Sequence, residues 1–327
     1  MASVLVIGDS SVDHIYVVET IPGPDAEVIA NRAVLIPGGA GGTIALGLRL
    51  LGESVALASR VGQDAFGELA LSKVERAGVD LSLVQRDPEA VTGVITILVQ
   101  PGGGRAMISH GGANRNLDVG QFRPEQVSGR DALVVSAYSL LGGRQREYSR
   151  VVIQAAMKAG IPVFVDLSTG AVDSLGGELF GALAGVDYLL MNQHEALTLT
   201  GSRSLSDAVH GIQERGFANV VVKVGEHGSV IVRGRHSELV DPHEVDDVID
   251  QTGAGDAFTA AFVHAVLAGA DLREAARLGN IAGAIAATEL GAQGRLVTAA
   301  ELAELAGGPP ASKPVAAGKR GKGAATA

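Results

Sequence analysis

The chain has 327 residues, with 45 glycines, no cysteine, no tryptophan and only 7 Phe and 4 Tyr. Without cysteine there is no disulfide, thiolate metal site or cysteine nucleophile, and the scarce aromatics disfavour a protein that stacks on nucleic-acid bases. A formal charge of −10 and the lack of any uncharged apolar stretch of about 18 residues disfavour a nucleic-acid or membrane partner.

The chain opens with a predicted buried strand. The run Val4–Ile7 is continuously apolar, and the residues before it lack the basic segment of a signal peptide. We therefore expect a cytoplasmic protein.

Apolar runs alternate with helical patterns along the rest of the chain. Runs rich in β-branched residues predict strands buried on both faces: Val4–Ile7, Leu133–Val135, Pro162–Val165, Tyr188–Met191 and Val220–Val224. Helical periodicity covers Gly42–Leu51, Ala65–Ala77, Arg144–Ala159, Ser204–Arg215, Asp256–Ala268 and Leu272–Thr288. This alternation predicts an α/β fold with a doubly wound, mostly parallel sheet.

Two segments interrupt the alternation. Ile15–Ile36 and Val91–His110 contain extended runs and turn signals with little helical period. Within the second, Val94–Gln100 and Arg105–Ser109 flank a Pro-Gly-Gly-Gly turn, which predicts a hairpin. We expect the two segments to form a small β subdomain at the carboxyl edge of the sheet.

The end of the chain differs in composition. Residues 307–327 are almost wholly Gly, Ala, Pro, Ser, Thr, Lys and Arg, with four basic residues and no acidic one. Such a segment cannot bury enough apolar surface to fold, so it predicts a disordered basic tail after a folded domain of residues 1–306.

The segment Asp250–Phe258 (DQTGAGDAF) carries the strongest chemical signal. Gly253, Ala254 and Gly255 precede a predicted helix whose first N–H groups are bare and lie at the positive end of its dipole. Such a turn binds a phosphate or a developing oxyanion. Asp256, in the first helical turn, is well placed to accept a proton from a hydroxyl beside that phosphate. The alternative is a tight turn followed by a carboxylate that only stabilises the helix start.

This string resembles the second signature of the ribokinase-like (PfkB) carbohydrate kinases, usually Asp-Thr-Thr-Gly-Ala-Gly-Asp. Other segments are similar to motifs of this family and follow in the same order: Gly8–Asp13, Ile21–Pro24, Pro37–Ala45, Arg60–Gly67, Gly111–Asn114, Asn192–Glu195 and Lys223–Gly228. The resemblance covers about residues 3–300. It implies a ribokinase-like three-layer α/β/α domain with a small β lid from about residues 14–36 and 91–112.

The resemblance implies roles in phosphoryl transfer from ATP. Asp256 would be the general base, and Gly253–Gly255 would form the anion hole for the transferred group. Asn192 and Glu195 would organise Mg²⁺ through water near the ATP phosphates. A capping box at the start of a helix explains the spacing of Asn192 and Glu195 equally well.

The nucleotide itself would lie against Lys223, Gly225 and Gly228, although a hairpin turn also explains these glycines. Asn280 resembles a residue that lines the adenine pocket of the family, and the alternative is a polar helix position. The segment that resembles the family's monovalent-cation loop, commonly a K⁺ site, includes Asp250, Thr252 and Gly291.

The substrate would bind at the carboxyl edge of the sheet. Asp13 follows the first strand and resembles an aspartate that accepts hydrogen bonds from sugar hydroxyls. The neighbouring substrate segment contains Gly38, Gly39, Gly42 and Thr43. Many family members have asparagine where this chain has Thr43, and a hydroxyl lacks the paired donor and acceptor of an amide. The substrate or its orientation therefore differs from that of ribose.

These features predict an ATP-dependent kinase of a primary hydroxyl on a small sugar. The alternatives are a nucleoside kinase and a catalytically silent sugar- or nucleotide-sensing relative. The strands of the lid would leave an exposed edge, which pairing of two lids would cover, so we expect a homodimer.

Overall fold

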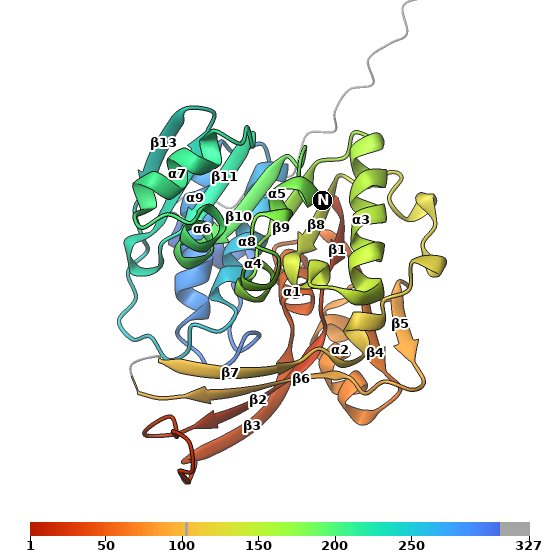
Figure 1. The fold of residues 1–327 in the computed structure, drawn as a ribbon, viewed down its shortest axis with the longest axis vertical. Helices are drawn as coiled ribbons and strands as arrows, with labels where there is room; N and C mark the ends of the chain where they lie inside the picture. The colour runs from red at the N-terminus through yellow and green to blue at the C-terminus, as the bar shows by residue number, and fades with distance from the viewer. Residues whose placement is uncertain (102–103, 308–327) are drawn as a thin grey trace, which may run out of the picture.

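A mostly parallel sheet forms the centre of the computed structural model, which describes residues 1–101 and 104–307 (Figure 1). Its nine strands lie in the order β13-β12-β11-β10-β9-β8-β1-β4-β5, and among the described residues the antiparallel pairs of this sheet are β11–β12 and β12–β13. The strands are β1 (Ser3–Ile7), β4 (Ser54–Gly62), β5 (Val84–Asp87), β8 (Ala132–Ser136), β9 (Val163–Asp166), β10 (Tyr188–Asn192), β11 (Asn219–Lys223), β12 (Ser229–Arg233) and β13 (His236–Val240).

Helices cover both faces of this sheet because successive side chains of each buried strand point to opposite faces. Val4 and Val6 belong to the apolar cluster on one face, which also contains residues of α1 (Ala40–Leu50), α2 (Ala65–Ala77), α8 (Ala254–Leu267), α9 (Leu272–Ala286) and α10 (Ala299–Leu305). Leu5 and Ile7 belong to the cluster on the other face, with residues of α3 (Gly143–Lys158), α4 (Thr169–Leu175), α5 (Glu178–Ala182), α6 (Gln193–Thr200) and α7 (Leu205–Gln213). The predicted three-layer α/β/α architecture is confirmed.

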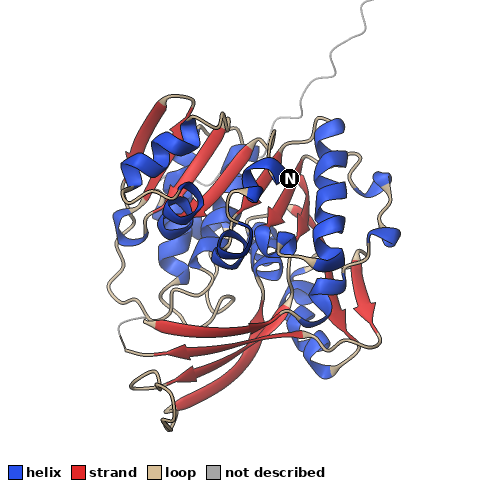
Figure 2. Cartoon of the chain, in the orientation of Figure 1, coloured by secondary structure: helices blue, strands red, loops and turns tan. Residues whose placement is uncertain are grey.

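A second, four-stranded sheet lies beside the main one (Figure 2). Its order is β3-β2-β6-β7, built from β2 (Ser11–Val17), β3 (Arg32–Gly38), β6 (Gly93–Val99) and β7 (Arg105–His110). The two segments that interrupt the α/β alternation therefore meet in one sheet, and the predicted hairpin is confirmed as the antiparallel pair β6–β7. Gly102 and Gly103 of its turn lie outside the described residues, as does the predicted tail from residue 308 onward.

The structure contains elements that the sequence pattern did not predict. Strand β4 is buried but reads SVALASRVG, and its alanines and serines weaken the β-branched signal. Helices α4, α5 and α10 span only 5 to 7 residues, too few to show a helical period. Short 3₁₀ helices join the larger elements: η1 (Gly112–Asn116), η2 (Val119–Gln121), η3 (Pro124–Gln126), η4 (Ala137–Leu140) and η5 (Gly225–His227). None of the helices in the described ranges has the length and apolar character needed to cross a bilayer.

Candidate active site

The predicted anion hole lies at the start of α8. Gly253 precedes the helix with φ +81°, and a Cβ there would lie 2.5 Å from Ala292 Cα, so the position requires glycine. Ala254 N–H donates to Gln251 O (3.2 Å) in a turn. Within the part of the chain that the structure describes, the N–H groups of Gly253 and Gly255 have no protein acceptor. They are free to donate to an anion at the positive end of the helix.

Asp256 stands in the first turn of α8, beside these N–H groups. Burial raises the pKa of Asp256 to about 7; the negative charge of Asp166 adds to the increase, and Lys223 opposes it. A carboxylate that titrates near neutral pH takes a proton from a hydroxyl more readily than one with an ordinary pKa. A pKa near 7 suits a group that accepts a proton near neutral pH.

Lys223 ends β11 and Asp166 ends β9, two parallel strands with β10 between them. The two side chains meet at the carboxyl edge of the sheet. Lys223 Nζ lies 2.6 Å from Asp166 Oδ1 and 3.4 Å from Gly255 O, and the Thr259 hydroxyl donates to Asp166 Oδ2 (2.7 Å). Asp166 is buried and Lys223 nearly so. The ammonium group thus lies against the turn that carries the free N–H groups.

Asn192 and Glu195 form a capping box at the start of α6. Asn192 Oδ1 accepts from Glu195 N–H and Glu195 Oε2 accepts from Asn192 N–H, both at 2.8 Å. Glu195 Oε1 accepts from the Thr169 hydroxyl (3.1 Å), and burial raises the pKa of the Glu195 carboxyl, with Lys223 opposing the shift. The capping interpretation is confirmed. The carboxylates of Glu195 and Asp166 are also the oxygen donors that suit Mg²⁺ with retained waters.

The substrate side of the site centres on Asp13 in β2. The carboxylate is buried, and burial together with the nearby charge of Asp250 raises the pKa of Asp13 to about 7. A Cβ on Gly38 would overlap this carboxylate. The hydroxyls of Ser11 and Thr43 are buried without a hydrogen-bond partner among the described residues. Buried polar groups of this kind are usually hydrogen-bonded, so these two are candidates to bind a ligand.

The glycines of the substrate segment form the start of α1. Gly39 precedes the helix with φ +86°, and Gly42 N–H donates to Asp9 O (3.1 Å). The segment therefore lies against the chain that leaves β1.

The predicted cation loop is organised by Asp250. Its Oδ1 accepts from the Thr252 N–H (2.9 Å) and hydroxyl (2.6 Å), and its Oδ2 accepts from Gly291 N–H (2.9 Å). The side chains of Asp250 and Thr252 therefore bind each other, and a cation in this loop would rely on backbone carbonyls.

The nucleotide residues lie on a hairpin and a helix. Gly225 and Gly228 lie in the turn between β11 and β12, both at positive φ, as the hairpin interpretation predicts. The Asn280 side chain donates to Val240 O (3.2 Å) and Asp241 O (2.8 Å), so it fastens α9 to the end of β13.

Sequence reasoning missed Asp9 and Tyr138 as site residues. Tyr138 lies within electrostatic reach of Asp256, Glu195, Asp9 and Asp166, whose charges add to the effect of burial and raise its pKa to about 12. Asp9 follows β1 and Tyr138 follows β8. Their position in the sequence was a usable signal. Each residue follows the end of a predicted apolar strand by no more than three residues, and open α/β sheets bind ligands at this carboxyl edge.

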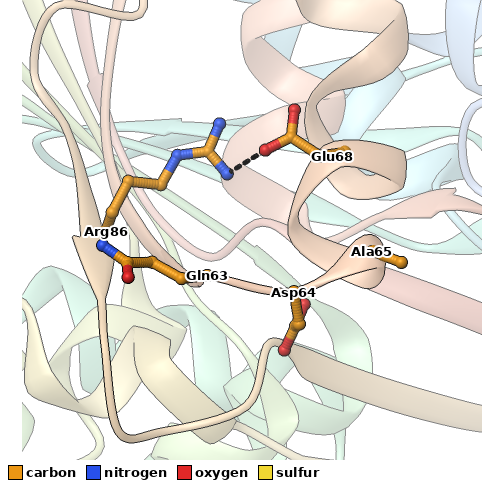
Figure 3. A pocket seen from close by; sticks show the side chains of 5 residues that line it. All are labelled: Gln63, Asp64, Ala65, Glu68 and Arg86. Atoms are coloured by element: carbon orange, nitrogen blue, oxygen red, sulfur yellow. Dashed lines mark ion pairs between the residues drawn. The ribbon is translucent and has the colours of Figure 1, made fainter.

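A hollow of about 500 Å³ at the start of α2 is lined by Gln63, Asp64, Ala65, Glu68 and Arg86 (Figure 3). Arg86 pairs with Glu68 at 2.7 Å. Asp64 accepts from Gly67 N–H, which starts the helix, and from both the N–H and the hydroxyl of Thr92. The charged groups that line this hollow are thus already paired or hydrogen-bonded within the protein.

Residues 1–299 match the pfkB family carbohydrate kinases. The chain is 28% identical over 306 residues to a ribokinase from Haemophilus influenzae, covering 91% of this chain and 96% of the relative. It is 30% identical over 295 residues to an ATP-dependent ribose-1-phosphate kinase from Halopiger xanaduensis, covering 90% and 94%. The crystal structure of adenosine kinase from Sinorhizobium meliloti superposes with a TM-score of 0.82 at 25% identity, covering 93% of this chain and 98% of that one.

Proposed function

The chain belongs to the pfkB family of carbohydrate kinases and is an ATP-dependent kinase, and we propose that it phosphorylates a primary hydroxyl of a small sugar. The observation that carries the proposal is the arrangement at the start of α8. Asp256, the free N–H groups of Gly253 and Gly255, and the Lys223 ammonium lie together at the carboxyl edge of the sheet. A base, an anion site and a cation are what phosphoryl transfer to a hydroxyl requires.

In the proposed reaction, Asp256 takes the proton of the accepting hydroxyl as its oxygen bonds to the γ-phosphorus of ATP. The bond from that phosphorus to the oxygen bridging it to the β-phosphate breaks, and ADP leaves. The N–H groups of Gly253 and Gly255 donate to the oxygens of the transferred group, where negative charge is concentrated. Lys223 supplies positive charge on the nucleotide side of that group.

The proposed cofactors are ATP with Mg²⁺, and K⁺. Bound Mg²⁺ would neutralise charge on the phosphates, and Glu195, with Asn192 at the same helix start, would orient its water ligands. K⁺ would bind the carbonyls of the loop that Asp250 and Thr252 organise. Gly225 and Gly228 would let the nucleotide approach the backbone, and Asn280 would hold the wall of the adenine pocket through its contacts with β13.

The four-stranded sheet is the proposed lid. Its inner face packs Ile15, Ile97 and Val99 against Leu290, and a Cβ on Gly291 would overlap Ile36 of β3. The four-stranded sheet therefore lies next to the loop that is held by hydrogen bonds to Asp250, which supports its proposed role as a lid. The sugar would bind between Asp13, the segment Gly38–Thr43 and the lid, and closure would exclude water from the phosphoryl group.

The outer face of the same sheet is the proposed dimer surface, occupied by a second copy of the chain. His14 pairs with Leu35 and Thr96, and Thr96 pairs with Ile108, so these four side chains share one face. Leu35 is 43% exposed and Ile108 is 70% exposed. A sheet face that exposes large apolar side chains such as Leu35 and Ile108 is stabilised when a second sheet covers it.

A nucleoside kinase is the second candidate, because the adenosine kinase superposes over nearly the whole chain. A sensing relative without turnover is the third. A screen of ATP consumption over pentoses, hexoses, keto-sugar acids, nucleosides and ribose 1-phosphate separates them. Highest turnover with any of the sugars, neutral or acidic, supports the proposal, a preference for nucleosides supports the second candidate, and binding without turnover supports the third.

A further inference from the structure

Asp9 forms part of the wall beside the proposed substrate segment. It follows β1, its main-chain oxygen accepts from Gly42 N–H (3.1 Å), and a Cβ on Gly39 would lie 2.5 Å from the same oxygen. The backbone of Asp9 is thus fixed against the first turn of α1, four residues before Asp13.

The Asp9 side chain is directed to the other face of the sheet, toward α3. Its Oδ1 accepts from Gln145 Nε2, and this amide is the one hydrogen-bond donor to the Asp9 carboxylate among residues 1–101 and 104–307. Gln145 is 3% exposed and lies in the first turn of α3, after the glycine pair Gly142–Gly143. Burial raises the pKa of Asp9 to about 6, with Gln145 and the charge of Arg115 opposing the shift. At neutral pH the Asp9 carboxylate is therefore ionised, and Gln145 is its one hydrogen-bond donor among the described residues.

Two further observations connect this wall with the reaction site. Tyr138 follows β8, the neighbour of β1 in the sheet, and the charges of Asp9, after β1, and of Asp256, in the first turn of α8, both act on it. The hydroxyls of Ser10 and Ser11, between Asp9 and Asp13, are fully or almost fully buried and have no partner among the described residues. Polar groups in such a state are satisfied by a ligand or by water.

The charges of this region restrict the substrate. Asp9, Asp13 and Asp256 lie near the carboxyl edge of the sheet. The cation that acts on Asp9 is the exposed Arg115, and the cation that acts on Asp256 is Lys223, which is paired with Asp166. A carboxylate or phosphate on the substrate would be repelled by these aspartates.

We propose that Asp9 and Gln145 bind a hydrogen-bond-donating group of the substrate, away from the accepting hydroxyl, and that they select neutral or cationic substrates over anionic ones. This inference rests on the proposed sugar-kinase function and adds the substrate class and two specificity residues to it.

The test compares the full chain with Asp9→Asn, Gln145→Met and the control Glu304→Gln, which removes an exposed charge on α10. The probes are D-ribose, adenosine and D-glucosamine as neutral or cationic compounds, and ribose 1-phosphate and 2-keto-3-deoxygluconate as anionic ones. The readouts are kcat and KM for ADP formation, calorimetric binding without ATP, and melting temperature. Asn keeps the shape of Asp and Met keeps most of the volume of Gln, so each variant retains the packing.

We expect the wild-type protein to have a higher kcat/KM for a neutral or cationic probe than for either anion. Asp9→Asn should raise KM for the best probe roughly tenfold to a hundredfold, with kcat changed much less, because a charge-assisted hydrogen bond is lost. Asp9→Asn should also reduce the ratio of kcat/KM for that probe to kcat/KM for ribose 1-phosphate. Gln145→Met should likewise raise KM for the best probe.

Preference of the wild-type protein for an anionic probe overturns the inference, as does a KM within twofold of wild type in both variants. If no probe is phosphorylated, the proposed function fails. Binding then decides separately: weaker binding of a neutral probe to Asp9→Asn supports this inference, and unchanged or undetectable binding of every neutral probe overturns it.

Discussion

Lys223 Nζ lies 2.6 Å from Asp166 Oδ1, at the point where the ends of β9 and β11 meet the first turns of α8. Both groups act on the proposed base, because Asp166 raises the pKa of Asp256 and Lys223 lowers it. The pair is nearly buried, so water screens these effects only weakly. Burial is the largest cause of the raised pKa of Asp256, and the two members of this pair adjust that pKa in opposite directions.

The pH dependence of kcat tests this control. For the wild-type protein we expect kcat to rise with pH and to reach half its maximum near pH 7, because the base works only when ionised. Lys223→Met should move the midpoint to higher pH and lower kcat, whereas Asp166→Asn should move it to lower pH. Lys158→Met, an exposed lysine at the end of α3, is the control and should leave the midpoint in place. Shifts in the same direction for both site variants would contradict the assignment.

Stability should depend on Asp256 in the opposite sense from activity. The pKa of Asp256 is about 7 in the folded chain against an ordinary 3.8, so between about pH 4 and pH 7 the folded state holds a proton that the unfolded state has lost. The free energy of unfolding attributable to this group therefore falls as pH rises through that window.

Asp256→Asn removes this dependence. We expect its melting temperature to exceed that of the wild-type protein by a few degrees at pH 8 and to equal it near pH 4. Thermal unfolding at the two pH values measures the difference. A variant that melts lower than the wild type at pH 8 would show that the buried charge is compensated in the folded state.

Gly253→Ala separates backbone strain from packing at the anion hole. An alanine at φ +81° costs roughly 1–2 kcal/mol, and here its Cβ would also meet Ala292 Cα at 2.5 Å. Gly216→Ala is a matched control, with φ +75° and open space around the Cβ position. Chemical denaturation should show a larger loss of stability for Gly253→Ala, and its kcat should fall while that of Gly216→Ala stays near wild type. Equal losses in the two variants would count against close packing at Gly253.

The outer face of the four-stranded sheet predicts the oligomeric state. Ile108→Asp and Leu35→Asp replace the exposed apolar side chains of this face with charges and should convert a dimer to a monomer in sedimentation equilibrium. Val248→Asp makes the same change at an exposed residue outside this sheet and should leave the dimer intact. A wild-type protein that sediments as a monomer would rule out the proposed interface.

The sequence predicted the architecture where residue patterns determine it locally. The boundaries of α2, Ala65–Ala77, match the prediction because Asp64 starts the helix and Gly78 ends it, both visible as capping residues. Strand β4 was missed because it contains no run of β-branched residues. Its burial depends on pairing with β1, which is distant in sequence.

In the site, too, the sequence predicted local features but not contacts between distant residues. Gly253–Asp256 could be found because one short segment carries both the free backbone N–H groups and the carboxylate. The pairing of Lys223 with Asp166, 57 residues apart, and of Asp9 with Gln145, 136 residues apart, follows from strand order, which the sequence alone does not specify. The capping box of Asn192 and Glu195 illustrates a third case, in which one spacing predicts two roles and coordinates reveal the structural one.

The most direct test of the account is the turnover of Asp256→Asn with the best substrate from the ATP-consumption screen. Asparagine keeps the shape of the side chain but cannot accept the proton, so we expect kcat to fall by roughly 10²–10⁴-fold. Calorimetry should show substrate and ATP affinities close to those of the wild type, and Glu304→Gln should keep full turnover. A variant that retains near-normal kcat would contradict the assignment of Asp256 as the base.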